Sequence, residues 1–279
     1  MKKIGLVSLF AVALLGACQA PRETTQETTN ESVRTTETST SKEEASTSNE
    51  EMSSSSTSSN ETTASSAETS TSTQENSTQT AFEQLKKEHP GTPMPQDIPT
   101  ASAHLNIAAT MTKQGFSVLY YQSEQALPLN DASLNQAEPI ASYLYQDGFA
   151  SSQETLNTIQ PFTIDTGGRQ VDLGYNIVGY QQGAAGSSIL EWQEGNWRLR
   201  IRASNIEGQD PVPLAKQIVT YLESARLPAP EKVGTIEINM TDGTSQNTRI
   251  IWQKPTTVYT ITNQDSMNAL KMAVSMEQQ

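Results

Sequence analysis

The chain has 279 residues and a formal net charge of −13, from 18 basic and 31 acidic side chains. This acidic balance disfavours nucleic-acid binding, because the phosphates of nucleic acids need basic partners. A single cysteine excludes intrachain disulfides and any metal site that requires several thiolates. We therefore predict a protein without a cofactor, whose partners do not include nucleic acid.

The N-terminus carries the three features of a secretory signal peptide. Lys2 and Lys3 form a positive head, and the almost wholly apolar run IGLVSLFAVALL follows at residues 4–15. The small residues Gly16 and Ala17 come next. The run is too short for a permanent membrane span, which needs about 20 residues. The pattern therefore predicts an exported chain.

The stretch Leu15-Gly16-Ala17-Cys18 resembles the lipobox of bacterial lipoproteins. In that family a diacylglycerol is attached to the cysteine thiol and the signal is cut just before it. The resemblance implies that residues 1–17 are removed and that Cys18 is the lipid attachment site. The two acyl chains of the diacylglycerol would make the anchor stable, because one chain alone binds a bilayer only marginally. The expected location is the outer face of the cell membrane.

Residues 18–80 are predicted to form a disordered tether. Between residues 21 and 80, 33 of the 60 residues are Ser or Thr, and 11 Glu outweigh three basic residues. Such a segment buries too little apolar surface to offset the entropy lost on ordering. As a flexible coil it would span roughly 40–45 Å. This length favours a Gram-positive cell, whose wall adjoins the membrane, although the lipobox also fits a Gram-negative one. The tether is either an unmodified spacer or O-glycosylated.

Residues 81–279 have the texture of a folded extracellular domain. A short helix at 81–89 and a Pro-rich connector lead to the first three predicted strands and to a helix that begins near Ser151. Ser151 and Glu154 have the spacing of a capping box. The predicted strands are 104–112, 116–124 and 138–146.

A hairpin is the clearest element of the domain, in SILEWQEGNWRLRIRAS at residues 188–204. With a loop at Glu194-Gly195, Trp192 would lie opposite Trp197 on an inward apolar face. Glu191 would then lie opposite Arg198 on the other face. A helix with the inward stripe Leu214, Ile218 and Leu222 follows, with Asp210 as its N-cap.

The next strands, 234–240, 249–253 and 256–262, precede a helix at 264–276 with Met267, Leu270 and Val274 predicted to face inward. Trp192 and Trp252 align, as do Ile201 and Ile261. This alignment indicates a degenerate β-β-β-α repeat, with units at about 165–228 and 233–277. Alternatively, the two units are not true repeats, and they align only because both have strands followed by a helix.

These elements predict an α+β fold with a mostly antiparallel sheet and helices packed on one face. Residues 187–277 end in a strand of the form W-x-x-x-x-x-x-Y-x-I followed by a short helix. In this they resemble uncharacterised extracellular domains of Gram-positive lipoproteins and membrane-linked regulators. The resemblance implies no known activity.

The sequence offers few signs of catalysis. Its two histidines, His89 and His104, do not form a metal-binding pair, and the chain has no Walker A loop and no Gly-x-Ser-x-Gly elbow. No metal ligand is predicted, and no catalytic residue. An active site assembled from distant residues would leave no such trace.

One pattern points to binding. Arg198, Arg200 and Arg202 alternate along one predicted strand and share its outward face, so they are candidate anion-binding residues. A solvated charged strand face is the simpler alternative. The tryptophans are predicted to pack in the core, with a sugar-stacking platform as the alternative.

We therefore predict a non-enzymatic surface lipoprotein whose domain binds an envelope component, such as a cell-wall polymer, or a partner protein. One alternative is an enzyme or enzyme accessory that acts on cell-wall or extracellular substrates. Another is a regulatory module that senses the envelope through a membrane protein.

Overall fold

The computed structural model describes residues 81–276 except 103, 241, 243, 245 and 246. The predicted signal peptide, Cys18 and the tether lie outside these residues. Among the described residues, no helix is long and apolar enough to cross a membrane.

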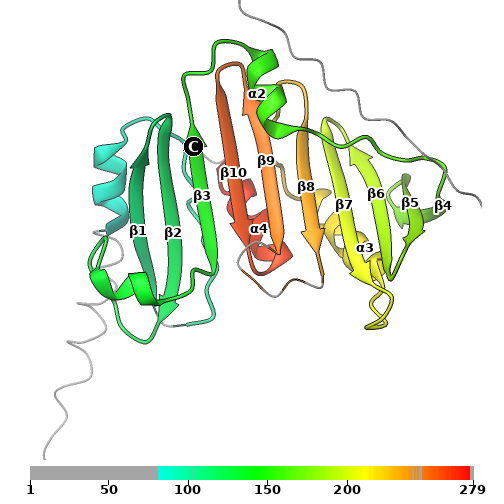
Figure 1. Cartoon of the computed structure of the whole chain (residues 1–279), viewed down its shortest axis with the longest axis horizontal. Helices are drawn as coiled ribbons and strands as arrows, with labels where there is room; N and C mark the ends of the chain where they lie inside the picture. The colour runs from blue at the N-terminus through cyan, green and yellow to red at the C-terminus, as the bar shows by residue number, and fades with distance from the viewer. Residues whose placement is uncertain (1–80, 103, 241, 243, 245–246, 277–279) are drawn as a thin grey trace, which may run out of the picture. The chain divides into compact units, whose positions relative to one another are not determined.

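Ten strands form one sheet in the order β1-β2-β3-β10-β9-β8-β7-β6-β5-β4 (Figure 1). Only β7 and β8 run parallel, and the other neighbouring pairs are antiparallel. The strands are β1 (His104–Thr112), β2 (Gly115–Ser123), β3 (Ala141–Gln146), β4 (Arg169–Gly174), β5 (Ile177–Ala184), β6 (Ser187–Glu194), β7 (Trp197–Ser204), β8 (Gly234–Asn239), β9 (Thr248–Lys254) and β10 (Thr257–Asn263).

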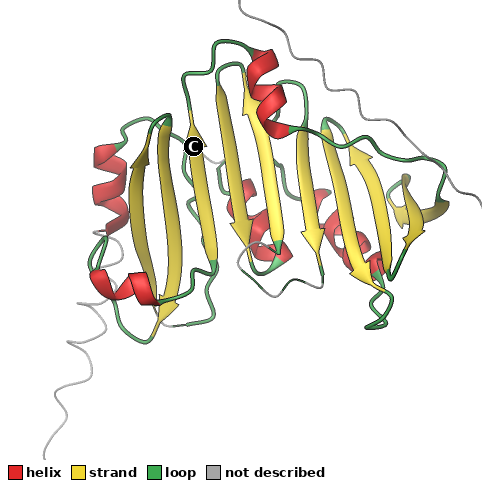
Figure 2. Ribbon diagram, in the orientation of Figure 1, coloured by secondary structure: helices red, strands yellow, loops and turns green. Residues whose placement is uncertain are grey.

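The helices lie beside and across this sheet (Figure 2). They are residues 81–88, the 3-10 helix η1 (Ala132–Gln136), α2 (Ser152–Ile159), α3 (Pro211–Leu222) and α4 (Ser266–Val274). The predicted α+β class and the mostly antiparallel sheet are thereby confirmed.

Side-chain caps fix where the helices begin. The carboxylates of Asp210 and Asp265 accept hydrogen bonds from backbone N–H groups in the first turns of α3 and α4. The Ser151 hydroxyl likewise accepts from the backbone N–H of Glu154, which confirms the predicted start of α2. Each cap satisfies a donor that the helix itself leaves unpaired.

α3 and α4 pack on one face of the sheet over the main hydrophobic core. α2 contacts β9 and β10 from the opposite face, so the prediction that the helices pack on one face was wrong for α2. The alternation of β9 shows this division, because Ile250 belongs to the main core while Ile251 packs with Ile159 of α2 in a separate cluster. We call the face that carries α2 the front face.

The inward stripes of the two long helices differ in part from the predicted ones. In α3, Ile218 is buried, but Leu214 and Leu222 are only partly buried. In α4, Leu270 is buried while Val274 is half-buried. The fully covered positions are instead Ala215 and Val219 in α3, and Ala269, Met272 and Ala273 in α4. The buried stripe of each helix is therefore centred about one position away from the predicted one.

All three tryptophans are buried, with 0–6% of their surface exposed, so the predicted core packing is confirmed. Four aromatic rings, from β3, β10, β9 and β7, form a row in the main core. Tyr145 packs edge-on against Tyr259, Tyr259 stacks on Trp252 with ring centroids 5.0 Å apart, and Trp252 meets Trp197 at 6.0 Å. Such contacts add about 0.5–1.5 kcal/mol per pair beyond area burial.

The hairpin of β6 and β7 exists, but its predicted register was wrong by two residues. Trp192 pairs with Leu199 instead of Trp197, and Glu191 pairs with Arg200 instead of Arg198. The turn is Gly195-Asn196, with Gly195 at φ +56°. A two-residue turn of this kind places glycine first, whereas the predicted loop would have forced Glu194 into that conformation. Because the shift is even, the faces of both strands are as predicted.

Two successive runs of strands and a helix occupy the predicted repeat units. Residues 165–228 contain β4 to β7 and α3, and residues 233–277 contain β8 to β10 and α4. The last hairpins of the two runs share one register, since Trp192 pairs with Leu199 and Trp252 pairs with Tyr259. The helix α3 connects β7 to its parallel neighbour β8.

The outer edge of β1 is partly sealed by Asn130, which lies in the connection between β2 and β3. The backbone N–H of Asn130 donates to the Ile107 carbonyl, and its side-chain oxygen accepts from the Ala109 N–H at 2.7 Å. Asn130 adopts φ +61°, a left-handed conformation that asparagine tolerates better than most residues. This contact occupies groups through which another strand could pair.

Candidate functional site

The arginines of β7 point to the front face because apolar residues alternate with them on the strand. Trp197, Leu199 and Ile201 face the core, which leaves Arg198, Arg200 and Arg202 on the opposite side. The three arginines therefore share one face, as the alternation predicts. They differ in what they contact.

Residues 160–168, which we call the strap, leave the end of α2 and reach β4 across the front face (Figure 1). Gln160 turns the chain out of α2 with φ +51°. Two polar contacts dock the strap on the sheet. A terminal nitrogen of Arg198 donates to the Phe162 carbonyl at 2.5 Å, and the backbone N–H of Asp165 donates to the Glu191 carboxylate at 2.9 Å.

Arg200 is also engaged beneath the strap. Its guanidinium lies 3.8 Å from the centre of the Phe162 ring, and its Nε donates to Glu191 at 2.7 Å. The Glu191 side chain is 4% exposed, so its charge is compensated almost entirely by protein groups. Arg198 and Arg200 therefore hold the strap, a structural role that the sequence alone did not predict.

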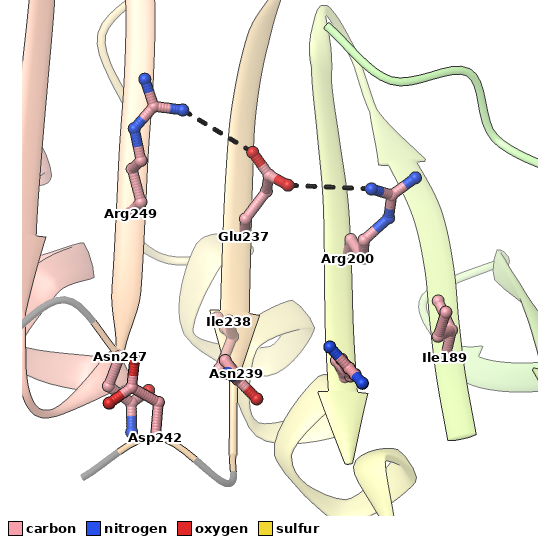
Figure 3. A pocket seen from close by; sticks show the side chains of 9 residues that line it. Ile189, Arg200, Glu237, Ile238, Asn239, Asp242, Asn247 and Arg249 are labelled. Atoms are coloured by element: carbon pink, nitrogen blue, oxygen red, sulfur yellow. Dashed lines mark ion pairs between the residues drawn. The ribbon is translucent and has the colours of Figure 1, made fainter. Parts of the chain in front are cut away.

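Glu191 and Arg200 begin a row of alternating charges across four strands. In register, Glu191 of β6 is followed by Arg200 of β7, Glu237 of β8 and Arg249 of β9. Glu237 lies between the two arginines, 3.7 Å from each (Figure 3). Exposure rises along this charge row, from 4% at Glu191 to 41% at Arg249. The row thus begins under the strap and ends in solvent.

A second row lies two residues further along β7. In register, Arg202 pairs with Ile189 on β6 and with Asn239 on β8. Asn247, which precedes β9, accepts a hydrogen bond from the Asn239 N–H. Arg202 is exposed, and its Nε donates to the Ser187 hydroxyl at 3.2 Å. Among the described residues, no carboxylate forms an ion pair with it.

Together the two rows enclose an open groove of about 550 Å³ on the front face (Figure 3). Its lining residues are Ile189, Arg200, Arg202, Glu237, Ile238, Asn239, Asp242, Asn247 and Arg249. Arginines from β7 and β9 stand on either side, and the shorter side chains of β8 lie between them. The lining carries three arginines and two carboxylates, whereas residues 81–279 together carry 13 basic and 20 acidic residues.

Hydrogen bonds set the charge of one lining carboxylate. The side chain and backbone N–H of Thr244 lower the pKa of Asp242, so this group is ionised at neutral pH.

In the part of the chain that the structure describes, no group of three or more His, Cys, Asp or Glu side chains is placed to hold a metal ion.

Sequence reasoning missed Glu237, Arg249, Asn239 and Asn247 as groove residues. Their strands were predicted, but the pairing of β7 with β8 was not. A strand–helix–strand run indicates parallel neighbours, because such a connection needs a crossover. That signal was present in residues 197–239 and would have placed β8 beside β7, although the pairing of Glu237 with Arg200 also depends on register.

Comparison with protein-family models, curated proteins and solved structures gives no match for this chain. The groove is therefore interpreted from its own side chains.

Proposed function

We propose that this chain is a membrane-anchored surface lipoprotein whose folded domain binds an envelope component or a partner protein without catalysing a reaction. The observation that carries this proposal is the sequence Leu15-Gly16-Ala17-Cys18 directly behind an apolar signal segment. A diacylglycerol on Cys18 would hold the chain on the outer face of the membrane. The Ser/Thr-rich residues that follow would act as a tether that lets the domain extend away from the membrane.

The charged groove supports the binding part of the proposal. Glu237 forms ion pairs with two arginines, and the pKa of Asp242 is lowered by its hydrogen bonds. A carboxylate such as Asp242, whose pKa is lowered, suits recognition by charge better than proton transfer, which needs a pKa near the working pH. Mixed charges and amides on an open groove favour a polar, charged partner.

The anchor is tested by fractionating cells that express the full chain or its Cys18→Ser variant. We expect the unmodified chain in the membrane fraction, with a mass increase that matches a diacylglycerol. The variant should lose this mass and leave the membrane. Ala17→Gly is the matched control, because it keeps a small residue before the cysteine. Retention of Cys18→Ser on the membrane would contradict the anchor.

The binding role is tested with a photoreactive side chain at Ile189, inside the groove, or at the exposed Lys216 on α3. Irradiation of living cells should capture one recurrent polymer or protein from position 189 but not from position 216. Equal capture from both positions would show that the groove has no specific partner.

A further inference from the structure

We propose that the groove binds the phosphate or carboxylate groups of an anionic extracellular polymer between Arg202 and Arg249. This inference rests on the proposed function, because it assumes that the domain faces the outside of the cell. Of the three arginines predicted to bind anions, the proposal keeps only Arg202, because Arg198 and Arg200 hold the strap. Arg249 joins it from another strand.

Arg202 retains most of its hydrogen-bonding capacity. A guanidinium carries five N–H donors, and in the described structure only Nε of Arg202 has a partner, the Ser187 hydroxyl. That contact holds the base of the guanidinium and leaves both terminal nitrogens for a ligand. Two parallel N–H donors match the spacing of oxygens in phosphate and carboxylate.

Arg249 is similarly available. Its contact with Glu237 is 3.7 Å long, which is an ion pair but exceeds hydrogen-bond length. The side chain is 41% exposed, and none of the hydrogen bonds among the described residues involves it. Glu237 therefore keeps Arg249 over the groove by charge without occupying its donors. Asn239 and Asn247 line the floor and add amide groups on the same side.

The charges around the groove select a polymer over a membrane surface. Residues 81–279 carry a net charge of −7, so a broad anionic bilayer would repel the domain as a whole. The groove lining alone carries three arginines against two carboxylates. Single anionic groups of a thin polymer can approach this local excess of positive charge while the rest of the polymer stays in solvent.

Binding is measured with the full chain in detergent micelles and three fluorescently labelled polymers. They are poly(glycerol phosphate), polyglutamate of matched charge, and neutral dextran. We expect anisotropy to report binding of one or both anionic polymers and none of dextran, with weaker binding at higher salt. The stronger of the two anionic polymers identifies phosphate or carboxylate as the preferred group.

Four single substitutions then locate the site. Arg202→Gln and Arg249→Gln should each weaken binding about tenfold, the effect of losing a charge-assisted contact. Arg226→Gln makes the same charge change at an exposed position outside the groove and should leave binding unchanged. Arg202→Lys keeps the charge but loses the paired donors, and an intermediate affinity is expected. Urea unfolding of each variant verifies that its fold is intact.

Two results would overturn the assignment. One is an equal loss of affinity in Arg226→Gln and Arg202→Gln, which would show binding by overall charge. The other is no binding to either anionic polymer. The Cys18→Ser fractionation does not depend on the groove, so a failed polymer assay leaves the anchor proposal standing.

Discussion

The ring of Trp197 on β7 lies directly over Gly234 on β8, its parallel neighbour in the sheet. A Cβ atom added to Gly234 would come within 2.5 Å of two ring carbons, Cε3 and Cζ3. The pair is in register, and the backbone N–H of Gly234 donates to the Asn196 carbonyl in the turn before β7. The absence of a side chain at position 234 therefore makes the space in which the buried ring lies beside Trp252.

Gly234→Ala should destabilise the domain by about 1–3 kcal/mol, the usual effect of overpacking a filled core. Gly183→Ala is the matched control, because a Cβ there meets nothing within 4 Å and should change stability by under about 0.5 kcal/mol. Urea denaturation followed by tryptophan fluorescence measures both. A combined Gly234→Ala and Trp197→Leu variant should show less than additive losses, and strict additivity would contradict the contact.

Arg200 and Arg202 are neighbours on one strand face, but their substitution is expected to affect stability to different extents. Arg200→Ala leaves the buried Glu191 carboxylate without its cation and should cost about 2 kcal/mol. This is less than for a fully buried pair, because the Arg200 side chain is 31% exposed. Arg202→Ala removes no ion pair of the described structure and should cost under about 0.5 kcal/mol.

Hydrogen exchange provides the second measurement for this pair of variants. The N–H of Asp165 donates to Glu191, so its exchange should accelerate in Arg200→Ala as the strap loosens. In Arg202→Ala the rate should match the unmodified protein. Unchanged exchange at Asp165 in both variants would mean that Arg200 does not hold the strap.

Glu194 lies at the end of β6 in a partly buried site, and its pKa is raised by desolvation and by the nearby charge of Glu223. The folded state therefore binds this proton more tightly than the unfolded state. This group's contribution to stability is fully present below the unfolded pKa and is lost as the pH rises through the folded pKa. Glu194 thus destabilises the fold at neutral pH relative to acid.

Glu194→Gln should remove this loss and raise the melting temperature at pH 7 but not at pH 4. The glutamine oxygen can still accept the hydrogen bond that the Trp192 indole donates to Glu194 at 2.7 Å. Thermal melts across this pH range provide the measurement, with Glu223→Gln expected to give a smaller change in the same direction. A melting temperature raised equally at both pH values would point to another cause.

Asn130 should contribute to stability through both its side chain and its backbone conformation. Asn130→Gly keeps the left-handed φ but loses the hydrogen bond from Ala109, at a cost of about 1 kcal/mol. Asn130→Ala adds the strain of a positive φ and should cost about 2 kcal/mol. Both variants open the edge of β1, so light scattering should detect more self-association than in the unmodified chain. Equal stability of the two variants would show that the left-handed backbone conformation at residue 130 does not contribute to stability.

Residue alternation predicted the faces of the strands but not how they pair. In β6 and β7 the inward placement of Trp192, Leu199 and Ile201 follows from period-two patterning, which any even shift of register preserves. The turn conformation of Gly195 decides between these registers. The alternation of apolar and charged residues was stronger evidence that a hairpin exists than for which residues pair across it.

The candidate site was harder to predict because three separate chain segments create it. Arg202 was found by its position on β7, but Arg249 joins it only through the order of β7, β8 and β9. The strap has no periodicity, so nothing local indicated that Phe162 would cover Arg200. Burial of a charged face by an irregular segment depends on contacts far apart in the sequence.

The last strand in the sequence, β10, occupies an interior position between β3 and β9. The edge of β3 therefore lacks its partner strand until more than 100 further residues have been synthesised, since Gln146 pairs with Val258. A chain that emerges N-terminus first cannot complete this sheet until β10 has emerged. Until then the edge of β3 that later pairs with β10 is exposed to pairing with other chains.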